Sequence, residues 1–169
     1  MNLHPGTVLI STPAMDDPKF LQAVLLITEY NTDGAMGFVV NKPFPRVLNE
    51  LIEFRDCVPF ALYEGGPVDQ EHLFFIHRRP DLIKEGTPVS ASVYSGGDFK
   101  QAVAHINQDP HSSKDLKLFI GYCGWDKGEL EAEIEDGFWR IIPGTPDLFF
   151  SPTEGLWERL HSGNAQSSS

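Results

Sequence analysis

The sequence predicts one α+β domain built around a mixed sheet. Strand-like and helix-like segments follow one another without a strict β–α–β order, which is typical of this fold class. At least one pair of strand-like segments is separated by a short polar turn, as in a hairpin. The 169 residues suit one domain with a core of its own, and they contain no internal repeat.

The N-terminal part of the chain predicts a strand followed by a hairpin. Residues 6–11 (GTVLIS) are interpreted as a strand that ends at a turn over 12–18, where two prolines oppose a continuous helix. Residues 20–29 and 36–40 are rich in apolar and β-branched side chains, as buried strands are. The intervening Asn31-Thr32-Asp33-Gly34 ends in Asp-Gly, so the two strands are predicted to form a hairpin.

The next segment predicts a helix and a tight turn. Apolar residues over 47–52 recur at helical spacing, and the predicted helix ends before Pro59. Pro45 is placed in its first turn, where proline is tolerated. Residues 64–69 (EGGPVD) are interpreted as a tight turn, because glycine adopts backbone angles that other residues avoid.

Two strands and a second helix are predicted further along the chain. Residues 72–77 (HLFFIH) and 89–94 (VSASVY) are the predicted strands. Apolar residues over 99–106 follow the i, i+3, i+4, i+7 pattern, which predicts an amphipathic helix. Asp98 stands immediately before it as the expected N-cap.

Residues 116–139 (LKLFIGYCGWDKGELEAEIEDGFW) form the most informative stretch of the sequence. An apolar strand leads into a glycine and aromatic turn over 121–124. An acidic helix follows, with Asp126 as its cap and Glu129 three residues later, as in a capping box. A last strand is predicted over 138–142, which makes the stretch a strand–turn–helix–strand unit.

The C-terminal segment predicts a short helix and a tail. Residues 151–154 (SPTE) combine a cap, a proline and an acid in the order typical of a helix start. The apolar residues that follow, over 156–160, supply its buried face. The sequence SGNAQSSS over 162–169 has nothing to bury and predicts a disordered tail, so the single domain is expected over 1–161.

The charge balance argues against nucleic acid and against anionic membranes as partners. The formal net charge is −11, with 24 acidic and 13 basic residues. Affinity for nucleic acid comes largely from Lys and Arg contacts to phosphate. Direct nucleic-acid binding is therefore not expected, and an acidic surface serves solubility.

The two cysteines and the N-terminus point to the cytoplasm. Cys57 and Cys123 are far apart and form no CxxC pattern, which favours free thiols. The first residues, 1–5, show neither a basic nor an apolar region of a signal peptide. The longest unbroken apolar run, 23–27, is too short to span a bilayer.

No sequence motif predicts a catalytic residue, a cofactor or a metal site. The chain has no GxSxG, Walker A, GxGxxG or HExxH pattern. His72 and His77 are five residues apart on a predicted strand and should point to opposite faces. His105 is expected on the polar, solvent-exposed side of its helix.

The acidic helix offers two alternatives. Glu129 with Glu133, and Glu131 with Glu135, lie four residues apart and could chelate a cation or flank a scissile bond. The favoured interpretation is a solvated acidic face, because repulsion at this spacing costs only a few tenths of a kcal/mol.

Cys123 and two tryptophans each allow a functional and a structural interpretation. Cys123 precedes a helix N-terminus that could lower its pKa, but no His or Lys stands beside it in the sequence. A packed cysteine is the favoured interpretation. Trp125 and Trp139 are interpreted as core anchors rather than as ligand platforms.

Six segments taken together resemble the YqgE/AlgH family of small bacterial proteins. They are GTVLISTPAMDDPKF, NTDGAMGFVVNKP, GGPVDQ, GYCGWDKGELEAEIEDGFW, DLFF and LWERL, in the family's order. The resemblance implies an α+β domain whose mixed, bifurcated sheet curls into a pseudo-barrel with helices packed around it. The family has no established enzymatic activity and no catalytic residues to transfer. Members are often labelled transcriptional regulators, and one branch is linked by name to alginate regulation.

One departure from the family concerns Cys123. Its position is commonly Ala or Ser in the family, which argues against a thiol mechanism shared by its members.

Three functional hypotheses follow. The first is a cytoplasmic regulatory or binding protein acting through a protein or small molecule of unknown identity, and the second is a direct DNA-binding regulator. The third is an enzyme whose site is assembled in three dimensions from Thr12, Asp16, Asn41 and Lys42. They are ranked in that order, and the oligomeric state is not predicted.

The glycine-rich turns are the expected walls of a ligand or partner cleft. The residues proposed to line it are Asn41, Lys42, Gly65, Gly66 and Trp125.

Overall fold

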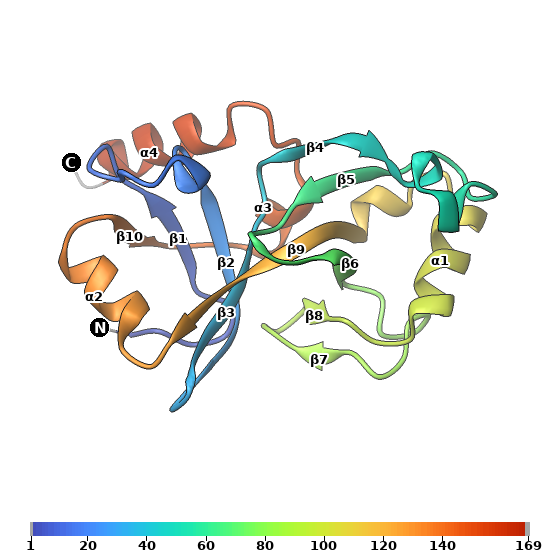
Figure 1. Cartoon of the computed structure of the whole chain (residues 1–169), viewed down its shortest axis with the longest axis horizontal. Helices are drawn as coiled ribbons and strands as arrows, with labels where there is room; N and C mark the ends of the chain where they lie inside the picture. The colour runs from blue at the N-terminus through green and yellow to red at the C-terminus, as the bar shows by residue number, and fades with distance from the viewer. Residues whose placement is uncertain (1, 168–169) are drawn as a thin grey trace.

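The computed structural model describes residues 2–167 as a ten-stranded sheet with four α-helices (Figure 1). The strands are β1 Val8–Ser11, β2 Val24–Asn31, β3 Gly34–Val39, β4 Pro43–Val47, β5 Ala61–Glu64, β6 Val68–His77, β7 Thr87–Pro88, β8 Tyr94–Ser95, β9 Leu116–Asp126 and β10 Trp139–Ile142. The helices are α1 Phe99–Gln108, α2 Glu129–Glu135, α3 Pro146–Phe150 and α4 Leu156–Ser167. Short 3₁₀ segments lie at Pro18–Phe20, Leu48–Glu50, Ile52–Phe54 and Ser112–Lys114.

The sheet branches at β9. The main path runs β10-β1-β2-β3-β9-β6-β8-β7, and β4 and β5 form a branch that joins at β9. Residues Leu118–Ile120 of β9 pair with β5 in parallel, whereas Gly124–Asp126 pair with β3 in antiparallel fashion. The α+β class with a mixed, bifurcated sheet is therefore confirmed.

The sheet curls around one hydrophobic core. Residues from the two ends of the sheet, such as Ile142 on β10 and Val93 beside β8, belong to the same buried cluster as Phe38 and Phe119 in its middle. The rings of Phe38 and Phe119 stack at 4.5 Å between centroids. Within the described residues β10 and β7 remain the unpaired ends of the path, so the pseudo-barrel is open.

Two helices cover the outer faces of the sheet at opposite ends of the molecule (Figure 1). Leu130 of α2 packs with Leu25 and Trp139 on one face. Ala102 and Ile106 of α1 pack with Leu118 and its neighbours on the other. Strand β9 runs between the two helices and contributes to all three hydrophobic clusters.

Local sequence signals were sufficient for several elements. Strands β2 and β3 form the predicted hairpin, and β1 occupies the predicted first strand. Helix α1 begins at the predicted place, where the Asp98 carboxylate accepts a hydrogen bond from the Gln101 backbone N–H at 3.2 Å.

The predicted helix over 47–52 is wrong. The chain instead completes β4 and continues through two 3₁₀ segments. The backbone N–H of Leu48 donates to the carbonyl of Phe60, so it is directed to a neighbouring segment rather than to a helical turn. Leu48 is fully buried but Ile52 is 83% exposed, so the apolar residues do not share one buried face.

The predicted glycine turn over 121–124 is also wrong. Gly121 and Gly124 lie inside β9, where Gly121 takes a left-handed φ of 71°. Gly65 lies where the branches of the sheet meet: its N–H donates to the Ile120 carbonyl and its own carbonyl accepts from Val39. Gly65 and Gly121 therefore permit close approach of strands. The turn predicted over 64–69 is present, because the chain reverses there between β5, which is parallel to β9, and β6, which is antiparallel to it.

Three smaller corrections concern segment limits. Strand β6 begins at Val68, before the predicted start, whereas most of the predicted strand over 89–94 is a loop leading to β8. Helix α3 was not predicted, and α4 begins at Leu156. The disordered tail over 162–169 stays a prediction, because residues 168–169 and the side chains from 163 onward lie outside the described part.

None of the helices in the described part of the chain is long and apolar enough to cross a bilayer.

Candidate functional site

A cleft of about 640 Å³ lies between the 3₁₀ segments and β6. We call it the apolar cleft. Its apolar lining consists of Phe44, Leu51, Ile52, Phe54, Leu73, Phe99 and Ile120, and its polar lining of Arg46, Glu50, Glu53, Gln70, Glu71 and His72. A volume of this size, lined by aromatic and aliphatic side chains beside polar ones, is typical of binding sites.

The short 3₁₀ segments expose apolar side chains at this cleft. Glu50 accepts a hydrogen bond from the Val47 backbone N–H at 2.8 Å, which holds the first segment in place. Leu51 then takes extended backbone angles and separates the two segments. Ile52 follows and is more exposed than any other large apolar side chain in the described residues.

The rim of the apolar cleft is acidic. Its charged residues include three glutamates, Glu50, Glu53 and Glu71, and one arginine, Arg46. The nearby Asp69 carboxylate lies 2.6 Å from Nδ1 of His72, and its hydrogen bond raises the pKa of that imidazole. The rim therefore presents more negative than positive groups.

Lys42 and Gly66 line a second cavity, of about 590 Å³, between the 3₁₀ turn at 18–20 and the start of β6. The Lys42 ammonium group donates to the Leu21 carbonyl at 2.5 Å. Desolvation by burial lowers the pKa of Lys42, and Glu158 acts in the opposite direction.

Asn41 holds the start of β2. Its Oδ1 accepts from the Val24 backbone N–H at 2.8 Å, and its Nδ2 donates to the Gln22 carbonyl at 2.9 Å. Asn41 shares a third cavity, of about 410 Å³, with Lys42 and residues beside α4. Both polar atoms of the Asn41 side-chain amide are hydrogen-bonded to backbone groups, so Asn41 stabilises the start of β2.

The five residues proposed for the cleft are divided among separate places. Lys42 shares one cavity with Gly66 and another with Asn41. Gly65 lies at the branch of the sheet. Trp125 borders a different cavity near the β2–β3 turn.

The residues of the enzymatic hypothesis form no common site. Thr12 donates its hydroxyl proton to the Gly137 carbonyl, and Asp16 is exposed. Neither lines the two cavities that contain Lys42. Since Asn41 is held by backbone groups, these residues provide no convergent acid–base pair.

The glutamates of α2 attach that helix to the sheet. Glu133 Oε1 accepts from the indole N–H groups of Trp125 at 3.2 Å and Trp139 at 2.9 Å. Glu131 accepts a hydrogen bond from the Tyr30 hydroxyl, which raises the pKa of Tyr30. No local pattern in the sequence predicts these long-range partners.

The prediction that Asp126 is the N-cap of α2 is wrong. Gly128 is the N-cap of α2, with a left-handed φ of 84°. Glu129 nevertheless makes half of the predicted box, because its Oε1 accepts from the Asp126 backbone N–H at 2.7 Å.

Cys123 is a packed residue. It is 1% exposed, and its Sγ lies 3.3 Å from the Gly65 carbonyl. Burial raises the pKa of the Cys123 thiol to about 12, so the nucleophilic thiolate is suppressed near neutral pH.

Lys117 is a buried cation that the sequence did not single out. Its Nζ donates to the Phe149 carbonyl at 3.0 Å and lies 4.1 Å from the centre of the Tyr63 ring. Desolvation lowers the pKa of Lys117 to about 7.

The histidines are divided between surface and interior. His72 is exposed and His77 is buried, with Nε2 against the Gly96 carbonyl at 3.1 Å. The expectation that His105 is solvent-exposed is wrong, because it is 6% exposed. It lies on the face of α1 turned toward the start of β9.

Comparison with known proteins identifies the relatives of this chain. The model of the AlgH-like family matches residues 8–165. UPF0301 proteins from Chlorobium chlorochromatii and Chlorobaculum tepidum are 33% and 34% identical over 158 residues, which cover 93% of this chain and 84% of each relative.

Two solved structures share the fold. The solution structure of the AlgH protein from Pseudomonas aeruginosa has a TM-score of 0.76 and 29% identity, over 98% of this chain and 89% of that one. Protein DIP2367 from Corynebacterium diphtheriae has a TM-score of 0.73 and 24% identity, over 93% and 85%. This α+β architecture with a branched sheet is thus found in other bacterial proteins. The chain belongs to the AlgH-like family, in agreement with the resemblance of its sequence segments.

Proposed function

We propose that this protein is a cytoplasmic regulatory protein that acts by binding a protein partner at the apolar cleft. The single observation that carries the proposal is Ile52, which is 83% exposed at the edge of an aromatic-lined hollow. Burial of a side chain of this size contributes about 1.5–3 kcal/mol, so covering it favours association.

The position of Ile52 favours a protein over a small molecule. Much of its side chain stands outside the hollow, and covering it requires a surface that extends beyond the hollow itself. Phe44 and Phe54 line the hollow and offer contacts for an apolar side chain of the partner. A buried centre with a polar rim is the usual anatomy of a protein interface.

The charges of the rim indicate the chemistry of the partner segment. With Glu50, Glu53 and Glu71 opposing Arg46, apolar side chains flanked by Lys or Arg are complementary to the cleft. The net charge of −11 supports the same preference for a basic protein segment over nucleic acid.

The experiment is photo-crosslinking in cells that express the protein. A benzoylphenylalanine replaces Ile52 in one variant and Leu82 in a matched control. Leu82 is 42% exposed and apolar but does not line the cleft. We expect position 52 to yield an adduct with one specific protein and position 82 to yield none of it.

Three results would contradict the proposal. One is the absence of a specific adduct at position 52, and another is the same adduct at both positions. The third is an adduct with nucleic acid or with a second copy of this chain, whose acidic rim would oppose its own.

A further inference from the structure

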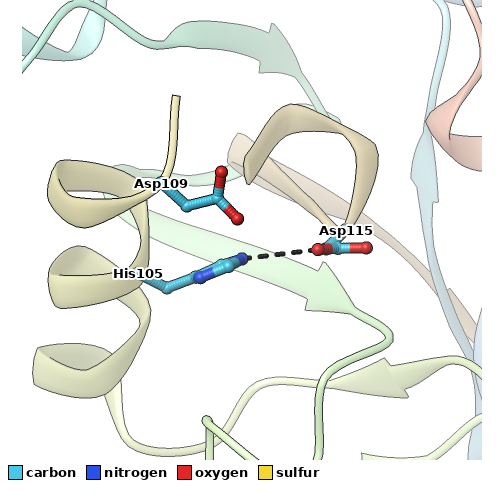
Figure 2. Close-up of side chains that lie close together, drawn as sticks. All are labelled: His105, Asp109 and Asp115. Carbon is cyan, nitrogen blue, oxygen red and sulfur yellow. Dashed lines mark ion pairs between the residues drawn. The ribbon is translucent and has the colours of Figure 1, made fainter. Parts of the chain in front are cut away.

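Three potential metal ligands meet where α1 ends and β9 begins. They are His105 in the last turn of α1, Asp109 immediately after that helix, and Asp115 immediately before β9. One side-chain donor atom from each lies within 4.8 Å of the others. Figure 2 shows the imidazole of His105 pointing away from α1 toward Asp115, with the Asp109 carboxylate beside the line between them.

The imidazole of His105 has no hydrogen-bond partner at its inner nitrogen. The side chain is 4% exposed, and Nε2 is buried without a partner among the described residues. The nearest carboxylate oxygen, Oδ2 of Asp115, is 3.6 Å away, which exceeds hydrogen-bond distance. A buried polar atom left without a partner costs about 1–3 kcal/mol.

Both carboxylates retain capacity for a further ligand. Oδ1 of Asp109 accepts from the His111 backbone N–H at 2.8 Å, which leaves its second oxygen available. Nη1 of Arg79 donates a long hydrogen bond to Oδ2 of Asp115 at 3.4 Å, whereas its Nε and Nη2 donate shorter ones to Asp81, at 3.0 and 2.8 Å. The positive charge beside Asp115 is therefore largely matched by another carboxylate.

We propose that His105, Asp109 and Asp115 bind one divalent transition-metal cation of the Zn²⁺ type. One imidazole nitrogen with two carboxylate oxygens is a donor set that such cations accept, with a fourth position for water. Metal–ligand bonds of about 2.0–2.1 Å require donors about 3.3 Å apart in a tetrahedron. The pair His105–Asp115 is close to this spacing, and Asp109 reaches it by an inward rotation of its partly exposed carboxylate.

A cation here would join the end of α1 to the start of β9. His105 lies in the last turn of α1, and Asp109 and Asp115 lie at the two ends of the segment between α1 and β9, so the ion would fix this segment without distorting the strand. The inference is independent of the apolar cleft, since none of the three ligands lines it.

The test is calorimetric titration of the full chain with Zn²⁺, for the wild type and for Asp109→Asn. Asp109 is partly exposed, so this variant is expected to fold, which circular dichroism verifies. We expect one site in the wild type and at least about tenfold weaker binding in Asp109→Asn, since even outer-shell partners contribute about 10–100-fold. His72→Asn is the control, because His72 and Asp69 form another, exposed histidine–carboxylate pair.

Nuclear magnetic resonance supplies the second readout. Zn²⁺ should shift the ¹⁵N resonance of His105 Nε2 in the wild type and in His72→Asn. The proposal is overturned if Zn²⁺ does not bind, if His72→Asn abolishes binding, or if Asp109→Asn binds as tightly as the wild type. An unmoved His105 resonance at saturating Zn²⁺ would overturn it as well.

Discussion

At the scale of single residues, Glu133 shows how a helix that looks merely acidic is attached to its sheet. One carboxylate oxygen of Glu133 accepts hydrogen bonds from the indole N–H groups of Trp125 and Trp139, whose residues are 8% and 2% exposed. Glu133→Ala should lower the free energy of unfolding by about 2–3 kcal/mol, because two nearly buried donors lose their acceptor. Urea denaturation measures the loss.

The matched control is Glu135→Ala, an exposed residue of the same helix, which should stay within about 0.5 kcal/mol of the wild type. Equal effects of the two substitutions would contradict this role.

Lys117 predicts a pH dependence of stability. Its pKa is about 7 in the folded protein and close to 10.4 in an unfolded chain, so the unfolded state binds more protons between these values. The contribution of Lys117 to stability should therefore rise with pH from about 7 to 10, by up to about 1.4 kcal/mol per pH unit. Below pH 7 both states are protonated and the contribution is constant.

The measurement compares wild type with Lys117→Met by urea denaturation between pH 6 and pH 9. Methionine preserves most of the buried volume without a charge. We expect the wild type to gain stability relative to the variant as the pH rises above 7. A difference in stability that stays constant over this range would show that the Lys117 ammonium group remains protonated in the core.

At the scale of elements, the branch at β9 depends on glycines that admit close backbone contact. A Cβ atom at Gly66 would lie 2.2 Å from the carbonyl carbon of Tyr122, a distance that real side chains do not tolerate. Gly66→Ala should therefore destabilise the fold by at least about 3 kcal/mol. At Gly124, a Cβ would meet only the Tyr122 ring, at 3.6 Å.

Gly124→Ala is accordingly the control, and it should cost much less than Gly66→Ala. Thermal unfolding of the two variants measures the contrast. Equal melting temperatures would show that the strands separate at the branch without loss of stability.

The same elements show what local sequence can predict. Helix α1 and the β2–β3 hairpin follow from signals within their own segments: the Asp98 cap with its apolar periodicity, and the polar turn over 31–34. The segment over 47–52 has helical periodicity too, but its backbone pairs with residues near β5 and leaves Ile52 at the surface. Periodicity alone does not reveal that pairing with a neighbouring segment replaces the helical hydrogen bonds. Pro43 and Pro45, just before the segment, do argue against a helix that begins there.

At the scale of the whole molecule, the curled sheet brings together residues that the sequence separates. Thus β6, β9 and the 3₁₀ segments surround one cleft, and α1 and β9 bring His105 and Asp115 together. Neither arrangement has a local signature, because each depends on the order of strands in the sheet. The family resemblance implied a bifurcated, curled sheet but not the order of its strands. The residues proposed for a cleft were chosen as turn residues, and they lie in several separate places.

The most direct measurement is the affinity of the partner captured at position 52 for purified wild type, Ile52→Asp and Leu82→Asp. If the apolar cleft binds that partner, Ile52→Asp should weaken binding by at least about 30-fold, which corresponds to about 2 kcal/mol, while Leu82→Asp leaves it unchanged. Both variants carry the same change in charge, so a general electrostatic effect would appear equally in each. Equal affinities of Ile52→Asp and the wild type would contradict binding at this cleft.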